Sequence, residues 1–284
     1  MIREIDYTAV QQRGADTVVE GVRHFDLAQT LDCGQAFRWA AMGQGVFCGF
    51  AHGRRLELEL TDHTLTLKNV TLAEFEMVWE NYFDLNRDYG KLRDMFNQHE
   101  TMKKALAFSP GLRLLAQDKW EMLVSFILSQ NSNIPRIKKM IETLCQNFGQ
   151  VLPCGGYAFP TAEKLAVLNE SDLAVVRSGY RAAYIIDAAQ QVASGKLNLH
   201  DVDSLPTEQL REALLAVHGV GPKVADCVLL FGFGRLECFP LDVWMKRVMQ
   251  TLYPSGFPQA LQQFAGIAQQ FLFHYARSTP GFGE

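Results

Sequence analysis

The stretch LLAVHGVGPKVADCVLL, residues 214–230, decides the fold of the second half of this chain. Apolar runs flank a short turn, which predicts two helices joined by a hairpin. Gly219 and Gly221 supply the backbone freedom that the turn needs, and Pro222 suits the start of the second helix. Free N–H groups at that start attract phosphate, which favours a clamp on a nucleic-acid strand that does not read its sequence. A helix–helix turn without any ligand is the alternative, and the glycines alone do not decide between them.

Lys223 is the unusual residue of this hairpin. A helical side chain leans toward the helix N-terminus, so this amine leans back over the glycines. The helix dipole and burial both disfavour a charged ammonium there, and a neutral lysine amine is a nucleophile that forms Schiff bases. Cys227 follows four residues later on the same helix face. The hairpin alone leaves Lys223 open between a phosphate-binding charge and a nucleophile, and Cys227 open between a core residue and a site residue.

A second motif, CFPLDVWMKRV, covers residues 238–248. Asp242 precedes an apolar helical pattern, so it is predicted to be the N-cap of that helix. The functional alternative is a carboxylate that stabilises positive charge on a sugar carbon as its base departs. One side chain can serve both purposes.

The arrangement of patterns along the chain predicts an α+β fold. Apolar and polar residues alternate within residues 45–70, which predicts antiparallel strands, and residues 24–39 are expected to add a strand and a glycine-containing loop. A helix capped by Thr71 follows, and helical patterns continue from about Tyr89 onward, one of them with Asp118 as its predicted N-cap. We therefore expect an N-terminal antiparallel β-sheet domain over residues 1–110. Residues 111–284 are expected to form an orthogonal α-helical body that contains the helix–hairpin–helix motif.

Composition excludes several classes of protein. The 284 residues carry a net charge of -4, which argues against a generic nucleic-acid coat protein but allows a local basic patch. The six cysteines include no Cys-x-x-Cys pair, so the sequence predicts reduced thiols and neither a zinc ribbon nor a disulfide framework. No signal peptide or membrane-spanning run is found, and a cytoplasmic protein is expected.

Blocks along nearly the whole chain resemble the 8-oxoguanine DNA glycosylase/AP lyase family of the helix–hairpin–helix superfamily. They occur in the family's order and include its N-terminal sheet domain. The blocks are CGQAFRW (33–39), LLAQDKWEMLVSFILSQNSNIPRI (114–137), SGYRAAYI (178–185), HGVGPKVADCVLL (218–230), FPLDVWM (239–245) and AGIAQQFLF (265–273).

The resemblance implies a base-excision-repair enzyme that flips 8-oxoguanine, paired with cytosine, out of duplex DNA. Lys223 would attack C1′ and form an imine that undergoes β-elimination, and Asp242 would assist proton transfer and stabilise positive charge. The implied base pocket consists of Gly34, Cys227, Gln269 and Phe273. The implied DNA contacts are Asn131, Arg136 and Arg181 around the orphaned cytosine, Tyr180 as a wedge beside it, and His218, Gly219, Gly221 and Trp244.

The chain also departs from the family's pattern at informative positions. His218 stands where the hairpin more often has proline, and Trp244 stands where animal members carry histidine. No cysteine follows Cys238, which argues against the iron–sulfur branches of the superfamily. The resemblance thus implies no cofactor, although it leaves open a monovalent cation on the hairpin carbonyls. It further implies a monomer in the bacterial cytoplasm whose partner is double-stranded DNA with a damaged base.

Two other functions compete with this interpretation. A monofunctional glycosylase for alkylated bases would use the aspartate with an activated water and usually lacks the lysine, so Lys223 argues against it. A non-catalytic helix–hairpin–helix DNA-binding protein would use Lys223 only as a charge. Asp242 and the full set of pocket residues argue against that second alternative.

Overall fold

The computed structural model describes residues 5–200, 202 and 204–283. Contacts group the chain into two units. The first unit joins the residues up to Gly49, Leu56–Ala116 and the residues from Leu241 onward, and the second joins Phe50–Arg55 and Gln117–Pro240. Each unit therefore combines segments that are distant in sequence. The predicted boundary after residue 110 stays a prediction.

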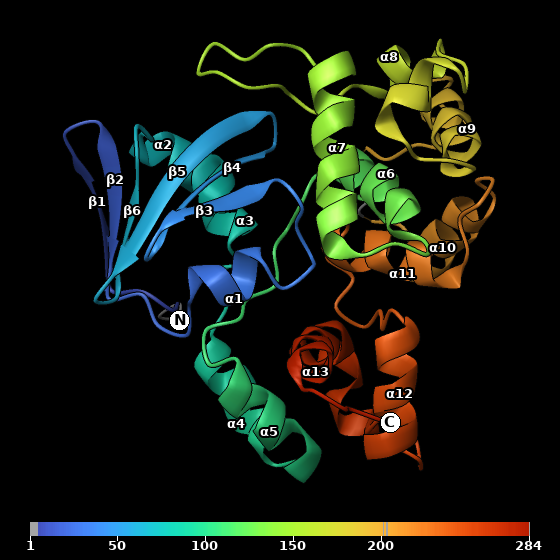
Figure 1. The fold of residues 1–284 in the computed structure, drawn as a ribbon. Helices are drawn as coiled ribbons and strands as arrows, with labels where there is room; N and C mark the ends of the chain where they lie inside the picture. The colour runs from blue at the N-terminus through green and yellow to red at the C-terminus, as the bar shows by residue number, and fades with distance from the viewer. Residues whose placement is uncertain (1–4, 201, 203, 284) are drawn as a thin grey trace. The chain divides into compact units, whose positions relative to one another are not determined.

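The N-terminal sheet confirms the strands that were expected from alternation. Its order is β1-β2-β6-β5-β4-β3, and the pairs β1–β2, β2–β6, β6–β5 and β4–β3 are antiparallel (Figure 1). Leu56, Leu58, Leu65 and Leu67 are buried while their neighbours along the strands are more exposed, because successive side chains of a strand point to opposite faces. The strands are β1 (Ala9–Arg13), β2 (Asp16–Glu20), β3 (Trp39–Gly43), β4 (Val46–Ala51), β5 (Arg54–Thr61) and β6 (Thr64–Leu67).

The prediction of a strand within residues 24–39 is largely wrong. This segment forms the short helix α1 (Leu27–Leu31), and β3 begins only at Trp39. The side chain of Asp26 accepts a hydrogen bond from the backbone N–H of Gln29 at 2.8 Å, which caps α1. The helix is too short for a 3.6-residue pattern to be recognised, so its cap is the only local signal. The expected glycine-containing loop does follow it, with Gly34 at φ 100°.

A helical segment covers one face of the sheet. It consists of α2 (Leu72–Glu74), the π-helix η1 (Phe75–Trp79) and α3 (Glu80–Tyr82), and it runs behind the strands in Figure 1. Thr71 Oγ1 accepts a hydrogen bond from the Glu74 N–H at 3.2 Å, which confirms the predicted cap. Trp39 Nε1 on β3 donates to the Tyr82 hydroxyl at 2.7 Å, so a buried polar contact ties the segment to the sheet.

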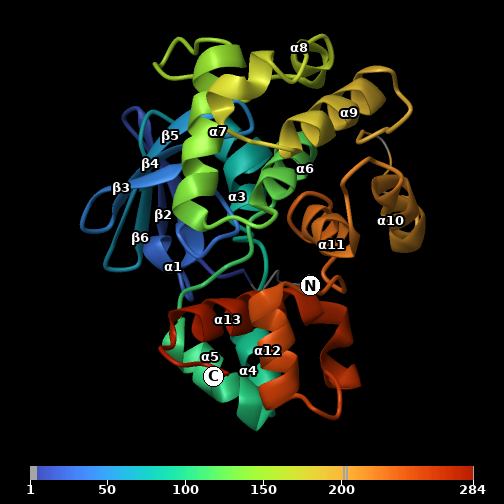
Figure 2. The same cartoon turned by 45° about the vertical axis from the view of Figure 1, so that its right-hand side comes forward.

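The C-terminal residues complete the first unit. Helix α13 (Ala265–Ser278) packs against α5 (Glu100–Phe108) and α12 (Val243–Leu252), as Figure 2 shows. The unit also contains α4 (Tyr89–Asn97) and the 3-10 helix η3 (Gln259–Phe264). The Thr101 hydroxyl donates to the Tyr253 hydroxyl at 2.7 Å, a contact between residues 152 positions apart in the sequence.

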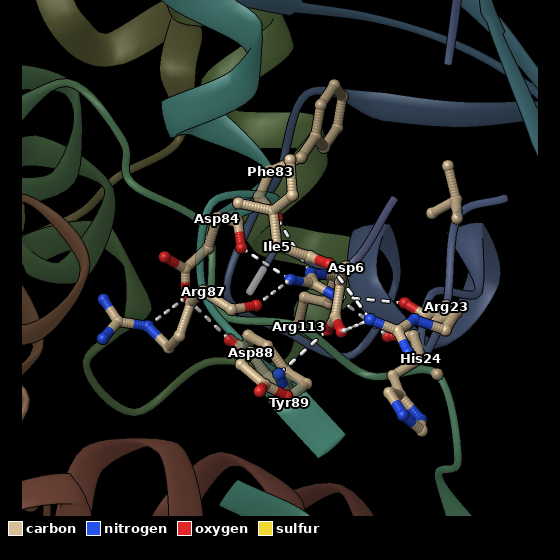
Figure 3. Close-up of polar contacts among 12 residues, drawn as sticks. Ile5, Asp6, Arg23, His24, Phe83, Asp84, Arg87, Asp88, Tyr89 and Arg113 are labelled. Carbon is tan, nitrogen blue, oxygen red and sulfur yellow. Dashed lines mark hydrogen bonds and ion pairs between the residues drawn. The ribbon is translucent and has the colours of Figure 1, made fainter. Parts of the chain in front are cut away.

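A buried arginine anchors the N-terminal segment within the first unit (Figure 3). Arg113 is fully buried, and its Nη1 lies 2.9 Å from Oδ2 of the equally buried Asp6. Its guanidinium also lies 4.0 Å from the ring centroid of Tyr89. The group further donates at 2.6 to 3.2 Å to the carbonyls of Arg23, Phe83, Asp84 and Arg87. A buried charge is tolerated when it is both paired and hydrogen-bonded, as this one is.

The second unit is helical. Helix α6 (Lys119–Ser129) begins at the predicted cap Asp118, whose side chain accepts from the Glu121 N–H at 2.8 Å. It packs against α7 (Ile134–Phe148), α9 (Arg181–Ala193) and α11 (Pro222–Phe231). The remaining elements are α8 (Ala162–Ala166), the 3-10 helix η2 (Asp172–Val176) and α10 (Thr207–Leu215). The α+β class is thus confirmed. None of the helices in the described residues is long and apolar enough to cross a membrane.

Candidate functional site

The hairpin between α10 and α11 has the predicted helix–turn–helix form, but its two glycines differ. Gly219 has φ 80°, and a Cβ there would lie 2.2 Å from the ring of Tyr184, so only glycine fits. Gly221 has φ −98° and ψ 177°, and a Cβ there would meet nothing within 4 Å. The expectation that both glycines are needed for the turn is therefore wrong for Gly221, whose backbone conformation any residue adopts.

Lys223 lies in the first turn of α11 and is half-buried. Its Nζ donates to the hydroxyl of Ser129 at 3.0 Å and lies 5.1 Å from the ring centroid of Phe126. Both partners belong to α6. No carboxylate of the described part of the second unit forms an ion pair with this amine. Cys227 is buried one helical turn further along α11.

Gln130, which directly follows α6, connects the hairpin to the start of α9. Its side-chain amide donates to the Gly219 carbonyl at 3.1 Å. Its own carbonyl accepts from Nε of Arg181 at 2.8 Å. Arg181 is buried and also donates to the carbonyls of Asn131 and Ser178, at 3.1 and 3.0 Å. In this structure the Arg181 guanidinium therefore organises backbone, and its contact with a base stays a prediction.

A ladder of aromatic rings lies beside the hairpin. Tyr180 is 51% exposed at the start of α9, and its ring meets that of Tyr184 edge-on at 5.6 Å. Tyr184 in turn meets the ring of His218 at 4.6 Å. The backbone N–H of His218 donates to Asp187 Oδ2 at 2.9 Å, a hydrogen bond that proline could not make at this position. His218, which stands where the family more often has proline, thus ties the turn to α9.

The remaining predicted DNA contacts of the second unit are accessible. Asn131 is exposed with φ 46°, a left-handed conformation that asparagine adopts more readily than most residues. Arg136 is exposed in the first turn of α7, where its backbone N–H donates to the Asn133 side chain at 3.0 Å. Both side chains therefore lie at a surface that a ligand can reach.

Asp242 is the N-cap of α12, as predicted. Its Oδ1 accepts from the Met245 N–H at 2.8 Å, and the residue is half-buried. Trp244 lies in the first turn of the same helix, with the guanidinium of Arg247 5.0 Å from its ring centroid. The cap role does not exclude an electrostatic one, because one carboxylate can cap a helix and also stabilise positive charge.

The predicted pocket residues of the first unit lie on two elements, the loop that carries Gly34 and the helix α13. Gly34 follows Cys33, whose buried sulfur accepts hydrogen bonds from the side-chain amides of Gln35 at 3.4 Å and Gln270 at 3.0 Å. Gln270 neighbours the buried Gln269 on α13. Burial raises the pKa of the Cys33 thiol, so the sulfur stays a neutral acceptor. The structure thus links the Gly34 loop to the helix that carries Gln269.

Phe273 lies on the same helix as Gln269, one turn further on. Its ring is half-buried, and the guanidinium of Arg277 lies 5.6 Å from its centroid. A cation over one face leaves a flat aromatic surface of the kind on which a base can stack. The stacking of a base on Phe273 stays a prediction.

Comparisons with known proteins cover both units. The family model described as "8-oxoguanine DNA glycosylase, N-terminal domain" matches residues 17–123, and the model of the "HhH-GPD superfamily base excision DNA repair protein" matches residues 124–263. A "Probable N-glycosylase/DNA lyase" of Methanothermobacter thermautotrophicus is 30% identical over 91% of this chain and 95% of its own length. The chain belongs to the 8-oxoguanine DNA glycosylase family.

Solved structures of this family agree with the fold. The Clostridium acetobutylicum 8-oxoguanine glycosylase/lyase, in complex with double-stranded DNA containing cytosine opposite 8-oxoguanine, is 36% identical with a TM-score of 0.90. That match covers 96% of this chain and 99% of the other. MBOgg1 in complex with a low-affinity DNA ligand is 41% identical with a TM-score of 0.90, and it covers 95% and 98% of the two chains. The predicted family and fold are therefore confirmed, while the roles of the individual site residues stay predictions.

Sequence reasoning missed several residues that support the site. Ser129, Gln130 and Tyr184 hold Lys223, Gly219 and His218, and Gln270 holds the Gly34 loop. In the sequence, Ser129 and Gln130 resemble an ordinary helix C-terminus. Only the resemblance of residues 114–137 to a family block marked that segment, and it gave these two residues no role.

Proposed function

We propose that this chain is a bifunctional DNA glycosylase/AP lyase of base excision repair, with Lys223 as its nucleophile. It would excise 8-oxoguanine paired with cytosine from duplex DNA. The observation that carries the proposal is the setting of Lys223: a half-buried amine at the hairpin, held by one neutral hydroxyl and in no ion pair with a carboxylate among the described residues of its unit. An amine held by a neutral hydroxyl and not in an ion pair can approach an electrophilic carbon, with which lysine amines form Schiff bases.

The reaction follows from the chemistry of an amine at a sugar carbon. Neutral Nζ of Lys223 donates its lone pair to C1′, the bond from C1′ to N9 breaks, and its electron pair leaves with the base. The base takes up a proton and Nζ loses one. Opening of the C1′–O4′ bond then gives an imine, O4′ takes up a proton, and removal of a C2′ proton expels the 3′ phosphate by β-elimination. Asp242 would stabilise the positive charge that develops on the sugar.

Recognition of the base would depend on one hydrogen-bond donor. N7 of guanine is an acceptor, whereas N7 of 8-oxoguanine carries a proton and donates. The Gly34 carbonyl would accept a hydrogen bond from this N7–H group in a dry pocket. Guanine has no such donor and would leave the carbonyl unpaired. Gln269 would bind the Watson–Crick edge, and Phe273 and Cys227 would cover the two faces of the base. The anchored Gly34 loop and the accessible ring of Phe273 support this assignment.

The hairpin and its neighbours would hold the DNA. Gly219, Gly221 and the N-terminus of α11 would contact a phosphate strand, and His218 and Trp244 would also contact the DNA. Tyr180 would insert beside the orphaned cytosine, and Asn131, Arg136 and Arg181 would bind it. A monomer in the bacterial cytoplasm stays a prediction, as do the absence of a cofactor and the cation left open at the hairpin.

Borohydride trapping tests the proposal on a duplex that contains one 8-oxoguanine opposite cytosine. Borohydride reduces an imine, so we expect a covalent protein–DNA adduct with the wild-type chain and none with Lys223→Gln. Asp242→Asn is a matched second variant, because asparagine caps a helix as well as aspartate does but lacks the charge. We expect it to slow base release at least about a hundredfold, as loss of one electrostatic stabiliser does. Its affinity for the duplex should stay close to that of the wild type.

Several outcomes would contradict the proposal. An adduct of wild-type yield with Lys223→Gln would exclude this lysine as the nucleophile. Release of an alkylated base without any adduct would favour the monofunctional alternative. Binding of the duplex without base release would favour the non-catalytic alternative. Equal loss of binding and base release in Asp242→Asn would reduce Asp242 to a cap.

A further inference from the structure

The hydroxyl of Ser129 is the hydrogen-bond acceptor that the structure gives to the Lys223 amine. Ser129 is the last residue of α6, and its Oγ lies 3.0 Å from Nζ. The two residues are 94 positions apart, so the contact depends on the packing of α6 against α11. That packing includes the ring of Phe126 on α6, which stacks on Phe231 of α11 with centroids 5.4 Å apart.

The direction of the hydrogen bond matters because a hydroxyl has one proton to give. Ser129 Oγ also lies 2.8 Å from the carbonyl oxygen of Phe126, which can only accept. The hydroxyl proton is therefore committed to that carbonyl, and toward the lysine Ser129 acts only as an acceptor. A neutral amine has two N–H groups and one lone pair. Ser129 thus holds one N–H and leaves the lone pair unshared.

The acceptor itself is fixed relative to the hairpin. The next residue, Gln130, donates from its side chain to the Gly219 carbonyl at 3.1 Å and receives the guanidinium of Arg181 on its own carbonyl at 2.8 Å. The C-terminus of α6 is therefore tied both to the turn and to α9. A hydroxyl held in this way restricts rotation about the Cε–Nζ bond of the lysine.

We propose that Ser129 is a positioning residue for Lys223, which holds the amine by one N–H so that its lone pair stays directed away from α6 and available for attack. The inference rests on the proposed role of Lys223 as nucleophile. A misdirected nucleophile is slow even when its substrate is bound, since correct orientation contributes a large part of enzymatic rates. Ser129 should therefore affect the rate of imine formation and leave the affinity for DNA unchanged.

The test compares Ser129→Thr with Ser129→Val, which have the same shape and differ in the hydroxyl. We expect the threonine variant to keep most of the wild-type rate of borohydride trapping on the 8-oxoguanine duplex under single-turnover conditions. The valine variant should trap at least about tenfold more slowly, as expected when a reacting group is misplaced. The affinity for the same duplex is measured separately, at low temperature before turnover. For both variants it should stay within about twofold of the wild-type affinity, a smaller change than the loss of one hydrogen bond to DNA would cause.

Ser125→Ala is the control, because it removes a hydroxyl from the same helix one turn earlier, while the Lys223 amine donates to Ser129. Thermal unfolding of each variant shows that it folds. Equal rates for the valine and threonine variants would overturn the inference, as would an equal loss for Ser125→Ala. If Lys223→Gln traps as well as the wild type, the proposed function itself fails. If Lys223→Gln abolishes trapping and the valine variant does not slow it, only the role of Ser129 fails.

Discussion

Arg113 in the first unit and Lys223 in the second are both cations that the fold withdraws from water, but they are held in opposite ways. Arg113 is fully buried, pairs with Asp6 at 2.9 Å, and donates to a set of backbone carbonyls. Lys223 is half-buried and donates to one neutral hydroxyl. No carboxylate among the described residues of its unit compensates its charge.

The difference separates a cation that holds structure from one that is free to react. A guanidinium surrounded by acceptors and an opposite charge cannot move without leaving buried polar groups unpaired. An amine with a single neutral acceptor can move toward a substrate at little cost to the fold. The contrast predicts that substitutions at the two positions affect different measurements.

Arg113→Met should have the largest effect on stability. It leaves the buried carboxylate of Asp6 with only the exposed Arg23, 3.7 Å away, as an opposite charge, so we expect the free energy of unfolding to fall by about 3–5 kcal/mol. Urea denaturation monitored by circular dichroism measures this. Asp6→Asn combined with Arg113→Met should be less destabilised than Arg113→Met alone, because it removes the uncompensated charge.

Lys223→Gln is the counterpart that sharpens the contrast. We expect it to change the free energy of unfolding by less than about 1 kcal/mol, the value of one net hydrogen bond, while it removes trapping. The comparison breaks down if Arg113→Met unfolds in the same urea range as the wild type. It breaks down equally if Lys223→Gln is as unstable as Arg113→Met.

The two hairpin glycines allow a smaller test within the second unit. Gly219→Ala introduces a Cβ at φ 80°, 2.2 Å from the Tyr184 ring, so we expect a loss of about 1–3 kcal/mol in the free energy of unfolding. Gly221→Ala meets nothing within 4 Å and should leave stability within about 0.5 kcal/mol of the wild type. If DNA backbone approaches Gly221, its alanine variant should still bind the duplex about tenfold more weakly.

Fluorescence anisotropy with a labelled duplex and thermal unfolding separate these two effects. A Gly221→Ala variant that binds as tightly as the wild type would show that the turn, and not close approach of DNA, explains this glycine pair. A stable Gly219→Ala variant would mean that Tyr184 moves aside, and the aromatic ladder would then lose its role in shaping the hairpin.

Features set by neighbouring residues could be predicted from the sequence. The caps at Thr71, Asp118 and Asp242 were predicted, because a side chain that accepts a backbone N–H three residues later is a local signal. The hairpin and Lys223 are also local features, because the glycines, the proline and the lysine lie within a few residues of one another. The helix α1 was missed because five residues show no period, even though Asp26 caps it.

Features that depend on distant residues could not be predicted. Nothing near Ser129 in the sequence indicates Lys223, since packing alone brings them together. Arginine is usually exposed, so no pattern in the sequence predicts Arg113 or Arg181 in the interior. The family resemblance assigned Arg181 to the DNA, and only the structure shows how much backbone it organises.

The smallest predicted effect is a pH dependence at the border of the Arg113 cluster. The half-buried ring of His24 adjoins this cluster. Burial lowers the pKa of His24 against the opposing charge of Asp6, and nearby Arg93, Arg113 and Arg23 lower it further. In the unfolded chain this histidine titrates near its ordinary value of about 6.5. Its contribution to stability is therefore complete above that pH and is lost as pH falls through the lower folded-state pKa.

His24→Asn should remove this dependence, because asparagine does not titrate and tolerates φ 50°. Between about pH 7 and pH 5, we expect the wild-type free energy of unfolding to fall more steeply than that of the variant, by less than about 1 kcal/mol after solvent screening. His52→Asn is the control, since His52 has φ 49° and lies in the other unit. Equal slopes for the wild type and His24→Asn would show that the cluster is insensitive to this histidine. Arg113 would then be held by its acceptors alone, which would make its contrast with Lys223 stronger.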